Sequence, residues 1–191
     1  MVQNPHFELR GINHLALVCK DMARTVDFYT NVLGMPLIKT IEFPGGGGQH
    51  FFFDCGGGDC LAFFWFADAP AAQPGISSAA HLPSEGSILS AHGSMNHVAF
   101  DVPEEKFDDY VARLKASGVK VSPVLNHNDG DPQTTIDKTT ASTFVRSVYF
   151  SDPDGILLEF ACWTRALDPK IDALDPPRNA KGEIRALEPA E

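Results

Sequence analysis

The chain lacks the features that would place it in a membrane, in an oxidising compartment or on a nucleic acid. It has no apolar run near the roughly 18 residues that a membrane-spanning helix needs, and residues 1–10 lack the apolar segment of a signal peptide. Its four cysteines form no Cys-x-x-Cys pair and suggest no disulfide framework. Lys and Arg number 15 against 25 Asp and Glu, whereas nucleic acids and anionic membranes attract basic surfaces. We therefore expect a cytoplasmic protein that binds neither nucleic acid nor membrane.

What the chain does contain is typical of a globular protein with a histidine-dependent site. Hydrophobic residues make up 43% and charged residues 21% of the 191 residues, a composition that excludes disorder. The length fits one domain or two small ones built as a pair. Seven histidines and 14 phenylalanines stand out, and a few of the histidines lie within apolar strand patterns.

A short repeat divides the chain into two similar modules. Residues 13–17 read Asn-His-Leu-Ala-Leu, and residues 96–100 read Asn-His-Val-Ala-Phe. A helical pattern follows each copy, over 22–33 in the first, and after Pro103 in the second. Three strand-like runs then follow each helix, at 37–42, 49–54 and 61–66, and at 119–123, 144–150 and 156–161.

The pattern predicts an α+β fold of two tandem βαβββ modules that form a cupped mixed sheet around a metal site. The predicted divisions are a first module (9–66), an inter-module loop or lid (67–94), a second module (95–163) and an extended C-terminal tail (164–191). Within the second module, the polar residues 126–142 are expected to form a loop.

Three side chains on predicted strands are candidate metal ligands. His14 and His97 occupy equivalent positions of the repeat, and Glu159 lies within the apolar run Ile-Leu-Leu-Glu-Phe-Ala. A carboxylate in such a strand is costly to bury unless it is paired or bound to a metal, or it lies at a solvent-facing edge. Two histidines and one carboxylate form the facial triad associated with non-haem Fe(II), although Mn(II), Zn(II) or Ni(II) would also fit these ligand types.

The duplicated unit, both Asn-His strands and the run Tyr-Phe-Ser-Asp-Pro-Asp-Gly-Ile-Leu-Leu-Glu at 149–159 resemble the vicinal oxygen chelate superfamily. That group includes glyoxalase I, methylmalonyl-CoA epimerase, fosfomycin resistance enzymes, bleomycin-resistance proteins and type I extradiol dioxygenases. The resemblance covers about residues 9–163. It implies that His14, His97 and Glu159 bind a divalent metal in a cup formed by the two modules.

The first module lacks the fourth ligand that glyoxalase-like and epimerase-like members carry. Matching Gly58 to Gly155 places Ala62 where Glu159 lies, so we expect three protein ligands. That count is similar to the extradiol dioxygenases and the fosfomycin enzymes. If the last two strands pair around Asp154, Tyr149 lies opposite Glu159, where the extradiol pattern has a tyrosine that donates a hydrogen bond to the bound catecholate. A core tyrosine is the competing interpretation.

The acid–base group is less well defined. The position that matches the ring-cleaving enzymes' histidine is Asp59 in this sequence. Other candidates are the histidines expected on loops, which are more typically surface residues: His50, His81, His92 and His127.

We therefore expect an Fe(II) extradiol-type dioxygenase that acts on a small aromatic diol, with Tyr149 and Asp59 as catalytic residues. The alternatives are a glyoxalase I-like or epimerase-like lyase/isomerase and a bleomycin-resistance-like binding protein. The expected partner is a small molecule that is a vicinal diol or another bidentate oxygen ligand, and a homodimer is a further expectation.

Overall fold

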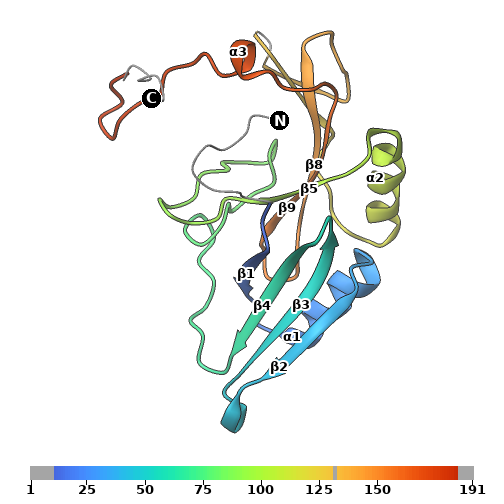
Figure 1. Ribbon diagram of the computed structural model, residues 1–191, viewed down its shortest axis with the longest axis vertical. Coiled ribbons are helices and arrows are strands. Elements are labelled where there is room, and N and C mark those ends of the chain that lie inside the picture. Colours follow the sequence, from blue (N-terminus) through green and yellow to red (C-terminus); the bar gives the residue numbers. More distant parts are fainter. Residues whose placement is uncertain (1–10, 131–132, 185–191) are drawn as a thin grey trace.

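The computed structural model describes residues 11–130 and 133–184, and it shows an α+β protein with two separate mixed sheets (Figure 1). The expectation about residues 1–10 lies outside the described residues, as does the end of the predicted tail. Each predicted module supplies one sheet, so the tandem βαβββ organisation is confirmed, although the two sheets of this chain are not joined into one.

The first module forms a four-stranded sheet in the order β1-β4-β3-β2. Strand β1 runs parallel to β4, and the other neighbours are antiparallel. The side chain of Asp21 accepts a hydrogen bond from the Arg24 backbone N–H and so caps the helix. The elements are β1 (His14–Val18), α1 (Met22–Asp27), a π-helical turn η1 (Phe28–Val32), β2 (Leu37–Glu42), a 3₁₀ turn η2 (Pro44–Gly46), β3 (Gly48–Gly56) and β4 (Asp59–Phe66).

The second module repeats this plan with one additional strand. Its five-stranded sheet has the order β5-β9-β8-β6-β7, and β5 runs parallel to β9 as β1 does to β4. The elements are β5 (Val98–Asp101), a 3₁₀ turn η3 (Glu104–Lys106), α2 (Phe107–Ala116), β6 (Leu125–Asn128), β7 (Thr134–Ile136), β8 (Thr143–Ser151) and β9 (Leu157–Trp163), followed by α3 (Pro169–Asp172).

Two predictions for the second module are wrong. The run 119–123 forms no strand and makes only an isolated bridge from Val121 to Phe150. The polar segment 126–142, predicted as a loop, contains most of β6 and all of β7. Its two asparagines are buried and have partners: the amide of Asn126 donates to the Thr135 carbonyl, and Asn128 accepts from Thr140 and Thr143 hydroxyls. Polar strands of this kind lack the alternation of apolar and polar residues from which a strand is predicted.

The two modules share one core and one polar junction. Leu17, Tyr29 and Phe63 of the first module pack in a cluster with Phe150 and Leu158 of the second. The Tyr29 hydroxyl donates to Asp152 Oδ2 over 3.3 Å, and the Lys20 backbone N–H donates to Asp154 Oδ2 over 2.9 Å. Asp152 also accepts from the backbone N–H groups of Asp154 and Ile156. The Asp-Pro-Asp-Gly turn therefore fixes the second module against the first.

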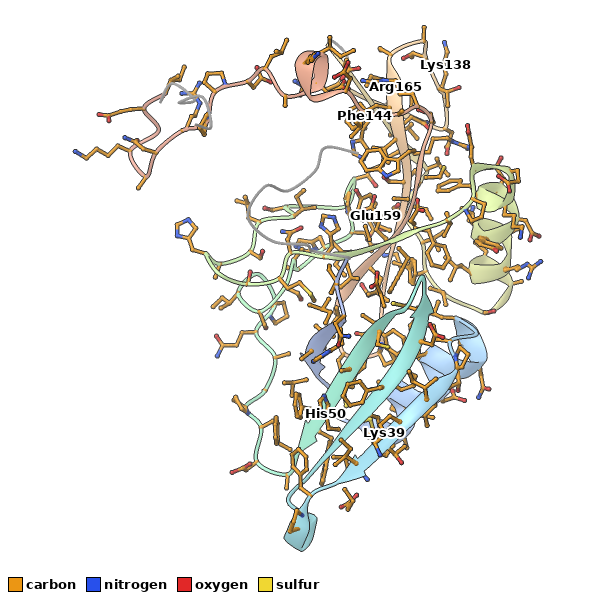
Figure 2. The ribbon with its side chains drawn as sticks, in the orientation of Figure 1. Lys39, His50, Lys138, Phe144, Glu159 and Arg165 are labelled. Atoms are coloured by element: carbon orange, nitrogen blue, oxygen red, sulfur yellow. The ribbon has the colours of Figure 1, made fainter. Side chains whose placement is uncertain are left out.

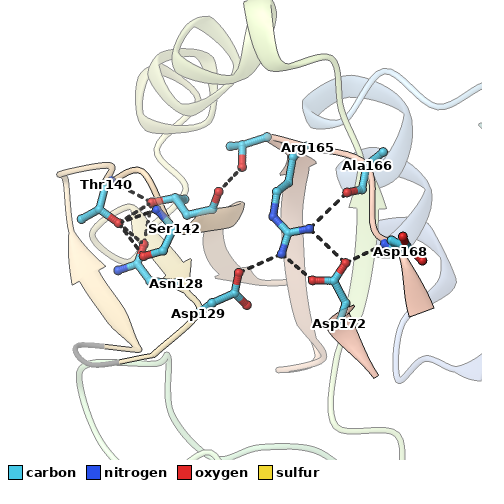
Figure 3. A network of polar contacts seen from close by, with 10 residues as sticks. Asn128, Asp129, Thr140, Ser142, Arg165, Ala166, Asp168 and Asp172 are labelled. Atoms are coloured by element: carbon cyan, nitrogen blue, oxygen red, sulfur yellow. Dashed lines mark hydrogen bonds and ion pairs between the residues drawn. The ribbon is translucent and has the colours of Figure 1, made fainter. Parts of the chain in front are cut away.

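The C-terminal segment leaves the body at a network centred on Arg165 (Figure 3). The guanidinium donates to Asp129 over 2.8 Å, and to both carboxylate oxygens of Asp172. Beyond this point the chain extends away from the sheets (Figure 1). In the part of the chain that the structure describes, no helix is long and apolar enough to cross a membrane.

Replacing Asp152 by Asn is expected to change how stability depends on pH. Burial raises the pKa of Asp152 to about 6. Between the ordinary aspartate pKa near 4 and about 6, only the unfolded chain loses this proton, so the free energy of unfolding of the wild type falls as pH rises. The variant should lack this component, which amounts to about 1.4 kcal/mol per pH unit within the window. Urea unfolding of both proteins at pH 4 to 7 measures it, and parallel curves would contradict the assignment.

Candidate metal centre

Strand alternation gives each sheet one face that carries the predicted ligands, which we call its ligand face. In the first sheet, His14 lies in register with Cys60 on β4, and Cys60 with Asp54 on β3. In the second sheet, Glu159 lies in register with Ala99 on β5, two residues after His97, and with Tyr149 on β8. Each module therefore presents its histidine at the start of the first strand, where that strand runs beside the last one.

The asparagine that precedes each histidine orients its imidazole ring. Nδ1 of His14 lies 2.8 Å from Asn13 Oδ1, and Nδ1 of His97 lies 2.9 Å from Asn96 Oδ1. An amide oxygen only accepts hydrogen bonds, so in this arrangement each Nδ1 carries the hydrogen and each Nε2 faces away from the asparagine, toward another partner. Histidine ligands of metals are held in this way by a partner on the other ring nitrogen.

His97 and Glu159 come together as ligands would. Nε2 of His97 lies 3.0 Å from Oε2 of Glu159, and the side chains are 36% and 7% exposed. A lone pair that faces a carboxylate oxygen is repulsive without a cation or a proton to share. Two donors at about 2.1 Å and at right angles on one octahedral ion lie about 3.0 Å apart, so the observed spacing fits a shared divalent metal.

His14 does not join this pair. No group of three or more histidine, cysteine, aspartate or glutamate side chains among residues 11–130 and 133–184 is arranged to hold a metal. Figure 2 shows Glu159 on the upper sheet and His50, which shares the ligand face of His14, on the lower one. The chain therefore brings together two of the three predicted ligands and leaves His14 exposed on its own sheet.

The predicted pairing of Tyr149 with Glu159 is confirmed by the register of β8 and β9. The Tyr149 ring lies edge-on to His97, with centroids 5.7 Å apart. Burial, and then the nearby Glu159 carboxylate, raises the pKa of Tyr149 to about 12. At neutral pH the hydroxyl is therefore protonated and acts as a hydrogen-bond donor rather than as a base.

The register also confirms that Ala62 is the counterpart of Glu159. Ala62 pairs with Ala16, two residues after His14, as Glu159 pairs with Ala99, two residues after His97. A methyl group therefore stands where a fourth ligand would extend.

The candidate acid–base groups separate by sheet face. Asp59 lies next to Cys60 in sequence, so its side chain points to the opposite face from His14, and its carboxylate lies beside Gly11. His81 and His92 are exposed on the inter-module loop. His127 is half-buried on β6, on the ligand face of the second sheet, and burial lowers its pKa.

The inter-module loop covers part of the second ligand face. Ala79 and Leu82 are each 6% exposed and pack with Leu125, Tyr149 and Leu157. The Ser78 hydroxyl donates to the Gly155 carbonyl, and Glu85 pairs with Lys120 over 2.7 Å. The composition of this segment predicts a long loop. It does not indicate that Ala79 and Leu82 are the loop residues buried against Tyr149.

Comparisons with known proteins show the family and the fold of the chain. The family model described as the Glyoxalase/Bleomycin resistance protein/Dioxygenase superfamily matches residues 11–160. Among curated proteins, fosfomycin resistance protein FosX of Listeria monocytogenes is 24% identical, over 82% of this chain and 92% of its own length. Metallothiol transferase FosB of Shouchella clausii is 28% identical, over 83% and 84%.

Solved structures show the same fold. The glyoxalase family protein from Enterococcus faecalis superposes with a TM-score of 0.56 at 22% identity, over 81% of this chain and 99% of that one. FosX from Listeria monocytogenes, complexed with Mn(II) and sulfate, superposes with a TM-score of 0.52 at 22% identity, over 82% and 94%. With a family match that spans most of the chain and a duplicated βαβββ plan that carries paired Asn-His strands, the chain belongs to the glyoxalase/bleomycin resistance/dioxygenase superfamily.

Proposed function

We propose that the chain is a divalent-metal enzyme whose small substrate binds through two neighbouring oxygen atoms. The observation that carries the proposal is the His97–Glu159 pair, held at ligand spacing with Asn96 behind the imidazole and Tyr149 beside it. FosX, a relative of similar length, has been crystallised with Mn(II), which supports metal dependence in proteins of this kind. A binding protein without a metal would not need this arrangement.

His14 completes the proposed site from a second copy of the chain. It carries the same Asn-oriented imidazole as His97, yet lies on a separate sheet and is itself exposed. A two-fold dimer would place the first ligand face of one protomer against the second ligand face of its partner and form two equivalent sites. The cup of the fold would then lie between protomers.

For the reaction, we propose extradiol-type cleavage of a small aromatic diol. A bound metal would supply Lewis acidity toward the two substrate oxygens and, as Fe(II), the redox chemistry that dioxygen requires. Tyr149 would donate a hydrogen bond to a substrate oxygen, and Leu82 with Ala79 would exclude water from that side. Because Asp59 points away from the ligand face, we assign proton transfer to His127 instead.

Charge supports an aromatic diol over a phosphonate. Among the described strand residues, Lys39 on the edge strand β2 carries its cation on a ligand face, whereas Arg146 on β8 points to the opposite face and lies over Phe107. A phosphonate dianion would have few cations to balance it beyond the metal, whereas a diol becomes anionic only as the metal takes up its oxygens. The second candidate, an addition reaction like that of FosX or FosB with Mn(II) as the metal, is favoured by the relatives themselves.

Mixing two inactive variants tests the composition of the site. His14→Ala and Glu159→Gln should each bind Mn(II) or Fe(II) far more weakly than the wild type. Co-refolded in equal amounts, they should recover about one quarter of the wild-type sites, because half of the dimers would be mixed and each would hold one intact site. Metal analysis after gel filtration measures the recovery. Full metal binding by His14→Ala alone would overturn the role of His14, and weak binding by both variants with no recovery on mixing would overturn its contribution from the partner.

Oxygen uptake separates the two reactions. Protein reconstituted anaerobically with Fe(II) should consume oxygen with at least one member of a catechol panel and should leave fosfomycin unchanged in the presence of thiols. Consumption of fosfomycin by Mn(II)-loaded protein, without oxygen uptake on any catechol, would establish the second candidate instead.

Replacing His127 by Gln should lower turnover of the substrate so identified by about 10²-fold, with metal content unchanged, since positioned acid–base groups contribute 10²–10⁴-fold. His92→Gln, at an exposed position of the inter-module loop, is the matched control and should keep wild-type turnover. Equal rates for both variants would remove His127 from the mechanism.

A further inference from the structure

The ligand face of the first sheet carries a row of aromatic rings that begins at His14. We call His14, Phe52, His50, Phe64 and Phe66 the aromatic strip. Ring centroids lie 5.6 Å apart from His14 to Phe52 and 4.4 Å apart from Phe52 to His50. His50 stacks on Phe64 at 3.6 Å, and Phe64 stacks on Phe66 at 5.3 Å, with planes within 10° and 9° of parallel.

The register explains why these rings form one row. Phe52 and His50 alternate on β3, and Phe64 and Phe66 alternate on β4, so all four point to the side of the sheet that carries His14. The intervening residues Phe51, Phe53 and Phe63 point to the other side, where they pack in or against the core. The strand sequence Phe-Phe-Phe thus divides between the core and the ligand face.

Phe43 packs against one end of the aromatic strip, with its ring centroid 6.2 Å from those of Phe64 and Phe66, and the strip remains outside the core along its length. Phe52, Phe64 and Phe66 belong to none of the core clusters, and Phe66 is 36% exposed. Val18 and Ile41, which flank the strip in register with Phe64 and His50, are 50% and 37% exposed. Nε2 of His50 is enclosed among the rings and finds no hydrogen-bond partner in the described residues. Covering an apolar surface of this kind lowers the free energy, because ring–ring contacts and burial of apolar area are both favourable.

We propose that the aromatic strip is the subsite for the substrate's aromatic body, with Phe52 and Phe64 as specificity-determining residues. The inference rests on the proposed function for one point, that the chelating oxygens lie at the metal beside His14. A planar ring attached to those oxygens meets Phe52 first, because Phe52 is the ring in contact with His14. An aliphatic chelator would reach the metal but leave the aromatic strip uncovered. The substrate class is therefore a diol on a planar, uncharged aromatic body that extends along the strip.

The test compares two ligands on the full-length protein with and without Mn(II). Naphthalene-2,3-diol carries both the oxygens and the ring, whereas oxalate carries only the oxygens. Phe52→Leu and Phe64→Leu keep apolar bulk but remove the ring, and Phe51→Leu makes the same change on the same strand toward the core. Calorimetric titration gives the affinities, and thermal unfolding verifies that each variant folds.

Phe52→Leu and Phe64→Leu should each weaken naphthalene-2,3-diol binding roughly two- to tenfold, the range expected for one aromatic pair, and should leave oxalate affinity unchanged. Phe51→Leu should lower stability without this selective loss. Should Phe52→Leu fail to fold, Phe64→Leu alone decides.

Equal loss of affinity for both ligands, or no loss of affinity for either, would overturn the subsite. So would variants that change only the dimerisation of the protein, which analytical ultracentrifugation measures. Failure of the proposed function is distinguishable. If Mn(II) does not bind but metal-free protein still binds the naphthalenediol and loses affinity on Phe52→Leu, the aromatic strip stands and the metal assignment falls.

Discussion

The parallel pairing of the first and last strand in each module is the constraint on which the site depends. It sets His14 beside Cys60 and Ala62, and His97 within reach of Glu159, through backbone hydrogen bonds alone. A shift of the pairing by one residue would turn Glu159 into the core and Leu158 toward the metal side, at the cost of an uncompensated buried carboxylate. The buried junction at Asp152 holds the turn that leads into β9, and so protects this register.

The two modules contribute different side chains to the candidate site. The second sheet carries two ligand candidates, a neutral tyrosine and a cover of loop residues, whereas the first contributes an imidazole and a surface of rings. Under the proposed function, one sheet would serve the chemistry at the oxygens and the other the body of the ligand. This division would give a role to Phe52, Phe64 and Phe66, which belong to none of the core clusters.

Much of this arrangement can be predicted from the sequence, and the failures have identifiable causes. The repeat indicates both modules, the repeated Asn-His strands and the apolar run around Glu159 indicate the candidate ligands, and a hairpin centred on Asp154 gives the Tyr149–Glu159 pairing. The strand at Leu125–Asn128 could not be predicted because its buried asparagines are stabilised by threonines up to 15 residues away. Asp59 matches the position of a histidine in the ring-cleaving enzymes, and only the observed register shows that its side chain points away. The separation of His14 from the other ligands is a property of how whole modules pack, which no local pattern encodes.

The Asn-His dipeptide has a consequence for how such a site can arise. The asparagine that selects the tautomer is the residue immediately before the ligand, so the ligand and its orienting group form one unit that needs no help from distant parts of the fold. Copying a module therefore copies an already oriented imidazole, the proposed metal ligand. The carboxylate has no such local support and occurs in one copy only, with alanine in the other. A duplicated module of this design begins with symmetric imidazoles, and a single side chain on its last strand then decides whether the proposed centre has three protein ligands or four.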